Sequence, residues 1–435
     1  MKVVLASGWY FPDTAGGTEV YVDSLARELS ALGVEPVVMA PSTRPQAYEY
    51  QHRGVRVVRY SVPEPRNAFE ARGISPPPNH AQFETLLKQE RAQIYHQHAW
   101  SRGLGIHHLV SARALGLKTL MTVHTPGLIC RRGTLLELGR APCDGHIQAT
   151  RCARCFLQKR GLPERLADAL AHTPLGLSAW ARDAAWLGRA SSVLGAAAES
   201  ASQLRALGQA AQHCEQVVVV CAWLRDALAR NGVPDSKMRL CRQGLSVDAP
   251  AVPSQPPEGN LKVGFLGRWD SVKGLDVLVG ALLALPAKLD WACEIRAPSP
   301  QDSEGLEYRQ AVLAAINGDP RFTLKEDRPR AELSDFFASI HLLAVPSQWF
   351  ETGPLVVLEA HAHGVPVIGT RLGGIAELVS EGVSGWLTDF NCTDQLIERL
   401  TKLCASPPPR LSAAQIVQVR TQAQVASEMV ELYGC

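Results

Sequence analysis

Short apolar runs of strand length alternate with segments of helix length in two separate parts of the chain. Alternation of this kind predicts an α/β protein with parallel sheets covered by helices. The strand candidates of the first series are 2–6, 35–39, 55–60, 93–98 and 119–124, and those of the second are 261–266, 293–295, 322–325, 342–345 and 365–369.

The chain is long enough for two domains. It has 435 residues, and single hydrophobic cores stop growing at roughly 250 to 300 residues. Residues 250–259 contain four prolines, a composition typical of an exposed linker. We therefore expect two Rossmann-like domains facing each other across a cleft, at 1–248 and 249–412, with a helix at 413–435 that packs back on the first domain.

Charge and hydropathy exclude two classes of protein. Lys and Arg number 44 against 42 Asp and Glu, so the chain has no strong field for holding nucleic acid. The longest apolar stretch, at 277–287, is far shorter than the roughly 18 residues of a membrane helix. Because Met1 also leads directly into a strand, we expect a cytoplasmic protein that could lie at the inner face of the membrane.

Two glutamates lie eight residues apart in the second half. Glu351 follows the strand that ends near Pro346, and Glu359 lies inside the next helix. Gly353-Pro354 places a proline in the predicted first helical turn, where free N–H groups and the positive end of the helix dipole favour an anion. Glu359 can accept hydrogen bonds from the two vicinal hydroxyls of a ribose.

This segment resembles the E-x7-E signature of family 4 glycosyltransferases, and the resemblance covers nearly the whole chain. Gly267-Arg268 and Lys273-Gly274, which follow the first strand of the second half, resemble the Arg/Lys pair of that family. The Gly16-Gly17 turn and His124 resemble the family's residues in the first domain. The resemblance implies a GT-B fold and sugar transfer with retention from a nucleotide-diphosphate sugar. It assigns catalytic roles to His124, Glu351, Arg268 and Lys273, and donor contacts to Gly16, Gly17, Gly267, Thr352, Gly353, Pro354, Leu355 and Glu359.

The chemistry of transfer suits these residues. Breaking a sugar–phosphate bond builds negative charge on the departing diphosphate, which the cations at positions 268 and 273 can offset. The chain has no Asp-x-Asp motif to hold magnesium, so we expect transfer to need no cofactor. A front-face reaction, in which the departing phosphate takes the acceptor proton, fits the absence of an identifiable nucleophile.

An insertion at about 125–210 interrupts the first domain. It begins with Cys130, Cys143, Cys152 and Cys155, a set that predicts a structural metal site with either zinc or a [4Fe–4S] cluster. We expect the metal to brace a segment that otherwise lacks a core. In this fold family the first domain binds the acceptor, so the insertion is our candidate for acceptor selection.

Several identities remain open for the acceptor and the reaction. Arginines with Trp180 and Trp186 in the insertion could hold a lipid-linked acceptor or a membrane surface, although ordinary packed helices would look the same. We expect a glycan, lipid-linked or small-molecule acceptor in bacterial surface polysaccharide or glycoconjugate synthesis. The alternatives are a sugar-phosphate synthase or phosphorylase and a non-catalytic metal-cluster protein that binds sugar nucleotides. A dinucleotide oxidoreductase ranks low, because the first glycine turn lacks G-x-G-x-x-G.

Overall fold

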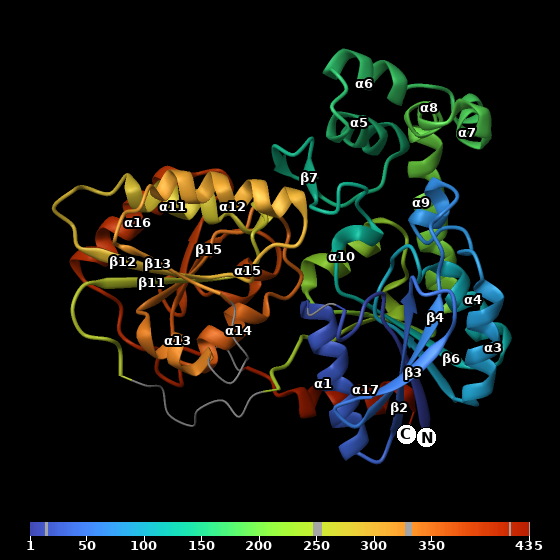
Figure 1. Cartoon of the computed structure of the whole chain (residues 1–435), viewed down its shortest axis with the longest axis horizontal. Coiled ribbons are helices and arrows are strands. Elements are labelled where there is room, and N and C mark those ends of the chain that lie inside the picture. The colour runs from blue at the N-terminus through green and yellow to red at the C-terminus, as the bar shows by residue number, and fades with distance from the viewer. Residues whose placement is uncertain (14–15, 247–254, 327–332, 417–418, 435) are drawn as a thin grey trace. The chain divides into compact units, whose positions relative to one another are not determined.

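The computed structural model describes residues 1–13, 16–246, 255–326, 333–416 and 419–434. The chain divides into two compact units. The first comprises Met1–Ser246 together with Thr421–Cys435, and the second comprises Val247–Arg420. Both are built around parallel sheets (Figure 1), so the predicted α/β class with two Rossmann-like sheets is confirmed.

The first unit has an eight-stranded sheet in the order β10-β9-β6-β5-β1-β2-β4-β3. All neighbours are parallel except β3 and β4. The order reverses next to β1, so the chain leaves β1 and β5 in opposite directions and opens a crevice at their carboxyl ends. The strands are β1 (Lys2–Ala6), β2 (Glu35–Ser42), β3 (Tyr48–His52), β4 (Val55–Ser61), β5 (Ile94–Gln97), β6 (Lys118–Val123), β9 (Gln216–Val219) and β10 (Met238–Leu240).

Helices cover this sheet, and the last helix of the chain is one of them. Helix α17 packs on α1, and Val425 and Met429 share a core with Tyr21 and Leu25. The Tyr433 hydroxyl lies 2.8 Å from Nδ1 of His96 in β5. The helices outside the insertion are α1 (Gly17–Ala31), α2 (Ala68–Ala71), α3 (His80–Glu90), α4 (Ile106–Ala114), α10 (Ala222–Arg230), η3 (Asp235–Lys237) and α17 (Gln422–Tyr433).

The insertion between β6 and β9 is a small helical body with a core of its own. Ala153, Leu157, Ala167 and Ala171 pack with Ala197 and are flanked by Phe156, so the expectation of a segment without a core is wrong. Because most of these side chains are small, the helices approach one another closely and bury them between their surfaces. The insertion contains η1 (Pro126–Leu128), β7 (Leu136–Glu137), β8 (Ala141–Pro142), α5 (Ala149–Lys159), α6 (Glu164–Ala171), α7 (Leu175–Asp183), η2 (Ala185–Leu187), α8 (Arg189–Leu194) and α9 (Ala196–His213).

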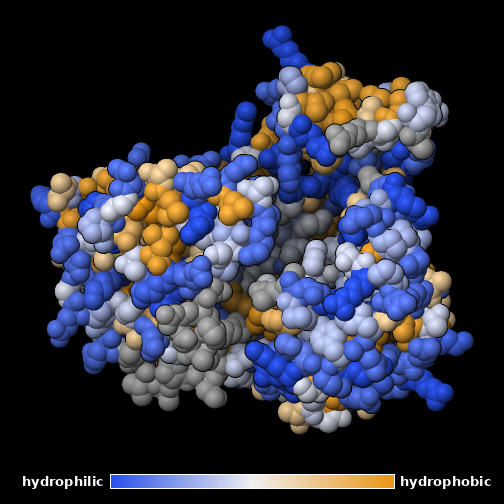
Figure 2. Space-filling model, viewed as in Figure 1, coloured by the Kyte–Doolittle hydropathy of each residue, from blue (hydrophilic) through white to orange (hydrophobic). Residues whose placement is uncertain are grey.

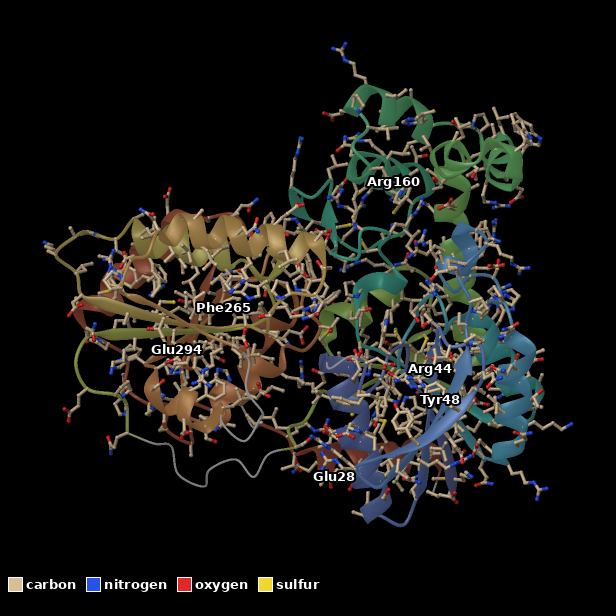
Figure 3. The ribbon with its side chains drawn as sticks, viewed as in Figure 1. Glu28, Arg44, Tyr48, Arg160, Phe265 and Glu294 are labelled. Atoms are coloured by element: carbon tan, nitrogen blue, oxygen red, sulfur yellow. The ribbon has the colours of Figure 1, made fainter. Side chains whose placement is uncertain are left out.

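The second unit has a six-stranded parallel sheet in the order β13-β12-β11-β14-β15-β16. This is the doubly wound order, with the reversal between β11 and β14. Buried side chains such as Phe265 of β11 form its core (Figure 3). The elements are β11 (Leu261–Leu266), η4 (Ser271–Lys273), α11 (Leu275–Leu283), β12 (Trp291–Arg296), α12 (Ser303–Ile316), β13 (Phe322–Lys325), α13 (Leu333–Ser339), β14 (Leu342–Val345), α14 (Leu355–Ala362), β15 (Val367–Thr370), α15 (Gly373–Leu378), β16 (Gly385–Thr388) and α16 (Thr393–Ala405).

No helix in the described part of the chain is both long and apolar enough to span a bilayer.

Candidate functional site

The sheet of the second unit brings two predicted site residues together. β11 and β14 are neighbours, and their carboxyl ends lead to Lys273 and Glu351. Lys273 Nζ lies 2.6 Å from Glu351 Oε1, and the Ser347 hydroxyl donates to the same oxygen at 3.0 Å. The pair therefore lies at the point where the strand order reverses, which is where open α/β sheets bind ligands.

Local backbone geometry fixes this pair. Gly274 has a φ of +69°, and a Cβ there would lie 2.0 Å from the carbonyl oxygen of Pro346. The Gln348 N–H donates to the Val272 carbonyl at 2.7 Å. Only glycine allows the loop after β11 to approach the loop after β14 this closely.

The carboxylate of Glu351 is buried and ionised. Burial alone would raise its pKa, but the Lys273 charge and hydrogen bonds hold the pKa below its usual value. Lys273 Nζ also lies 5.2 Å from the centre of the Trp349 ring, a distance at which the ring face attracts a cation. The site therefore brings a lysine side chain into contact with a buried carboxylate.

The loop 351–354 and helix α14 complete this edge of the sheet. Pro354 is the N-cap residue with an extended ψ of 102°, so the helix begins at Leu355 and the prediction of proline within the first turn is wrong. Thr352 and Glu359 are buried, at 8% and 5% exposed. A buried carboxylate in the second turn of α14 differs from the solvated acid of an ordinary helix surface.

Sequence reasoning missed the turn that begins α15. The Gly374 N–H donates to the Glu351 carbonyl at 2.6 Å, and a Cβ at Gly374 would lie 2.5 Å from the Thr352 carbonyl oxygen. The signal was the pair Gly373-Gly374 shortly after the predicted strand 365–369. These glycines let α15 support the loop that carries Glu351.

The remaining predicted residue of the Arg/Lys pair lies apart from the ion pair. The Arg268 side chain is 66% exposed, and its guanidinium is 3.4 Å from Asp270 Oδ2. Gly267 precedes it, and its N–H donates to the Arg296 carbonyl at 3.1 Å. The described contacts thus bring Lys273 into the ion pair with Glu351 and leave Arg268 exposed.

In the first unit, His124 lies at the carboxyl end of β6 within an aromatic cluster. Its Nε2 is 3.2 Å from Nδ1 of His98, and the Tyr21 ring centre is 4.7 Å away. Burial lowers the pKa of His124 to about 3, so the imidazole is neutral at pH 7. It suits hydrogen bonding to a hydroxyl better than proton transfer. His98, which also follows a strand, was missed by the sequence reasoning, although it stands two positions after His96.

The predicted glycine turn begins helix α1. Gly16 is its N-cap and Gly17 its first residue. A Cβ at Gly16 would lie 2.6 Å from Oε2 of Glu19, whereas a Cβ at Gly17 would meet nothing within 4 Å. The carboxylate of Glu19 therefore lies against this turn, and Gly16 makes room for it.

Two family models match most of the chain. The one described as Glycosyltransferase Family 4 matches residues 15–165, and the one described as Glycosyl transferases group 1 matches residues 251–419. The chain belongs to the family 4 glycosyltransferases.

Curated relatives support this assignment at different lengths. A D-inositol 3-phosphate glycosyltransferase of Corynebacterium urealyticum is 31% identical, but the match covers 39% of this chain and 42% of the relative. The chain thus spans less than half the length of the first relatives that it matches. An enzyme of the same name from Arthrobacter sp. is 25% identical across 91% of this chain and 83% of its own length.

Solved structures share the fold of this glycosyltransferase. Sucrose-phosphate synthase of Thermosynechococcus elongatus matches with a TM-score of 0.65 at 19% identity, over 99% of this chain and 94% of that chain. HepE of Anabaena, solved with UDP and glucose, matches with a TM-score of 0.64 at 14% identity, over 99% of each chain. The GT-B fold expected from the sequence is therefore confirmed.

The four clustered cysteines of this glycosyltransferase line one small pocket of about 30 Å³. Arg151 donates to Cys143 Sγ at 2.9 Å, and the Leu138 N–H donates to Cys155 Sγ at 3.2 Å. Burial raises the pKa of Cys152 to about 11. No three Cys, His, Asp or Glu side chains among the described residues are arranged to hold a metal ion. As the side chains lie, the four thiols are therefore not set as metal ligands, although they share one pocket.

Proposed function

We propose that this family 4 glycosyltransferase moves a sugar, with retention, from a nucleotide-diphosphate sugar to an acceptor hydroxyl. The observation that carries the proposal is the Lys273–Glu351 pair at the strand reversal of the second unit. We assign donor binding to 249–412 and acceptor binding to 1–248; of the predicted tail 413–435, helix α17 packs on the first unit, whereas the chain up to Arg420 belongs to the second. The acceptor would be a glycan, lipid-linked or small molecule in bacterial surface polysaccharide or glycoconjugate synthesis.

Each site residue has a part in this reaction. The ammonium of Lys273 offsets charge on the departing diphosphate, and exposed Arg268 is available to join it when the donor binds. The N–H groups that begin α14 face the same phosphates, and Thr352, Gly353, Pro354 and Leu355 shape that contact.

The two glutamates and the histidine hold the sugar and the ribose. Glu351 accepts hydrogen bonds from the donor sugar, and Glu359 accepts them from the ribose. Neutral His124 bonds to a sugar hydroxyl. Gly16, Gly17 and Gly267 leave room for the donor. We assign transfer no metal or cofactor.

Donor binding tests this function directly. Wild-type protein is titrated with UDP-, GDP- and ADP-sugars, and thermal stabilisation and donor hydrolysis are followed. One donor should stabilise the wild type and the Glu398→Gln control, an exposed carboxylate on α16, but not Glu359→Gln. Stabilisation by NAD or NADP with no response to any sugar nucleotide would refute the proposal.

The insertion carries an exposed apolar surface that we assign to a lipid-linked acceptor or its membrane. Trp180 and Trp186 are 57% and 76% exposed, with Leu175 and Leu177 beside them in the chain. Figure 2 shows apolar side chains gathered over the insertion helices. Tryptophan favours the membrane interface, because its ring is apolar and its N–H is polar.

Vesicle flotation tests this assignment. The Trp180→Ser/Trp186→Ser protein should lose binding to anionic vesicles, while Leu306→Ser, which removes an exposed apolar side chain from the second unit, should keep it. Equal binding by all three proteins would refute a membrane role for this surface.

We assign the cysteine pocket a structural metal ion, zinc or [4Fe–4S], held by Cys130, Cys143, Cys152 and Cys155. What supports it is that the loop after η1, the end of β8 and helix α5 bring all four thiols to one pocket. Elemental analysis after anaerobic purification should find zinc or iron in wild type and Cys404→Ser, but not in Cys152→Ser/Cys155→Ser. Metal-free wild-type protein would refute it.

A further inference from the structure

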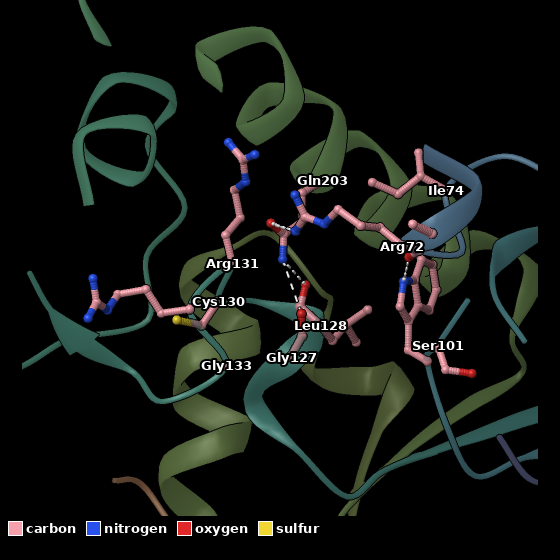
Figure 4. Close-up of a pocket in the computed structure, with 12 residues that line it drawn as sticks. Arg72, Ile74, Ser101, Gly127, Leu128, Cys130, Arg131, Gly133 and Gln203 are labelled. Atoms are coloured by element: carbon pink, nitrogen blue, oxygen red, sulfur yellow. Dashed lines mark hydrogen bonds between the residues drawn. The ribbon is translucent and has the colours of Figure 1, made fainter. Parts of the chain in front are cut away.

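The first unit contains a pocket of about 210 Å³ beside the residues already described. It lies at the carboxyl edge of the sheet, because Trp100 follows β5 and the segment 127–133 follows β6. Arg72, whose carbonyl accepts from Trp100 Nε1 at 2.8 Å, and Gln203 of α9, which donates to the carbonyls of Gly127 and Leu128, also line it (Figure 4). Gly127 is three residues after His124, so the pocket adjoins the end of the strand that carries the site histidine.

Arginines dominate the polar lining of this pocket. Arg72, Arg131 and Arg132 all contribute to it. The Arg131 side chain is only 2% exposed, and Arg72 is 24% exposed. Among the described residues, buried Nε of Arg131 and buried Nη1 of Arg72 have no hydrogen-bond partner. Buried N–H groups of this kind are costly unless something accepts from them.

The positive charge of the pocket exceeds the negative charge placed to offset it. Arg131 pairs with Glu199, and Arg72 Nη1 lies 3.9 Å from the same carboxylate. Arg72 Nη2 donates instead to the neutral amide of Gln203 at 2.7 Å. Figure 4 shows that amide between the Arg72 guanidinium and the carbonyls of Gly127 and Leu128. One carboxylate therefore serves two guanidinium groups.

We propose that this pocket binds the phosphoryl group of a phosphorylated acceptor. Guanidinium N–H groups are strong donors to phosphate oxygens, and Arg72 Nη1 and Arg131 Nε are buried donors of this pocket that have no acceptor among the described residues. Trp100, Leu128 and Ile74 supply apolar walls for the carbon skeleton. The inference rests on the proposed transferase function and adds the acceptor class to it. The phosphate could belong to a soluble sugar phosphate or to a lipid headgroup.

Calorimetric titration of the full-length protein tests the pocket. The probes are glucose 6-phosphate and glucose, then vesicles of phosphatidic acid in phosphatidylcholine and of phosphatidylcholine alone. Arg72→Met is the test variant, because Glu199 keeps Arg131 as its partner. Arg44→Met, which removes an exposed arginine of the same unit, is the matched control, and Arg72→Lys tests whether charge without the fork is enough.

Wild type and Arg44→Met should bind one phosphorylated probe at least about tenfold more tightly than its unphosphorylated partner. In Arg72→Met the ratio of the two affinities should fall about tenfold, as expected for the loss of one hydrogen bond between charged groups. Preference for glucose 6-phosphate indicates a soluble acceptor, and preference for phosphatidic acid indicates a lipid one. No preference for either phosphate, or equal losses in Arg72→Met and Arg44→Met, overturns the inference.

Failure of the pocket can be told apart from failure of the proposed function. Binding of UDP-, GDP- and ADP-sugars to the wild-type protein is measured alongside. A protein that binds a donor but no phosphorylated probe retains the transferase proposal and loses the anion pocket. A protein that binds phosphate at this pocket but no sugar nucleotide loses the proposed function instead.

Discussion

Lys273→Met removes the cation that lies within hydrogen-bond distance of the buried Glu351 carboxylate. The two charged atoms are 2.6 Å apart, which at an effective dielectric constant of about 20 corresponds to about 6 kcal/mol of gross attraction. Desolvation of both groups offsets part of this. Breaking such a pair by removing one partner costs about 3 to 5 kcal/mol, and we expect that loss in urea unfolding.

The matched variants are Glu351→Gln and the double variant Lys273→Met/Glu351→Gln. Because the double variant leaves no unpaired charge, it should be more stable than the sum of the two single losses predicts, by about 2 kcal/mol or more. All three variants should lose donor hydrolysis, since the pair also lies in the proposed donor site. Strictly additive losses of stability would refute the reasoning, because they would mean that the two charges do not interact.

The pH dependence of the same variants gives a second test. The wild-type pKa of Glu351 is depressed in the folded state, so the stability that it contributes is present above the ordinary carboxyl pKa and is lost as the pH falls. Without Lys273, burial is the dominant influence and raises that pKa. Lys273→Met should therefore gain relative stability on acidification, where the wild type loses it.

Three further predictions concern stability and the fold. Gly274→Ala should destabilise the second unit by about 2 kcal/mol or more, because φ is +69° and the new Cβ would meet the Pro346 carbonyl. The control Gly280→Ala has open space in helix α11 and should stabilise the unit by about 0.5 to 1 kcal/mol. Thermal unfolding measures both changes. Acidification should destabilise the first unit, because burial holds the pKa values of His96 and His124 near 3 and those of His98 and His108 well below normal. The stability that each of these four histidines contributes is fully present above the ordinary pKa of about 6.5 and falls by about 1.4 kcal/mol per pH unit below that value. Unfolding midpoints that stay constant from pH 7 to pH 5 would contradict this. Tyr433→Phe should lower the free energy of unfolding in urea by about 1 kcal/mol, because it removes the hydroxyl that bonds to His96. The control Tyr48→Phe removes a hydroxyl that has no hydrogen bond among the described contacts, so it should lower that free energy by less.

Short sequence patterns were enough to predict several structural features around the candidate site. The strand before Glu351, the buried helix around Glu359 and the glycine next to Lys273 all follow from short spacings and from the chemistry of glycine and proline. These features are reliable because period and turn chemistry act over a few residues. The same reasoning erred by one position at Pro354, since a proline at an N-cap and one in the first turn leave similar patterns.

Other features had no signal of this kind. The insertion's core consists largely of alanines, which a hydrophobic pattern barely distinguishes from an exposed helix. The cysteine spacing was clear, but spacing does not determine that Arg151 lies against Cys143. The arginine pocket was missed because Arg72 and Gln203 are 131 residues apart.

The sequence alone determined the α/β class, the two series of strands and the residue types available for chemistry, because these depend on neighbouring residues. Only the tertiary structure decided which of those residues meet. Lys273 and Glu351 are 78 positions apart and pair because β11 and β14 are adjacent at the strand reversal. That strand order depends on packing helices against both faces of the sheet, and this is a property of the whole domain.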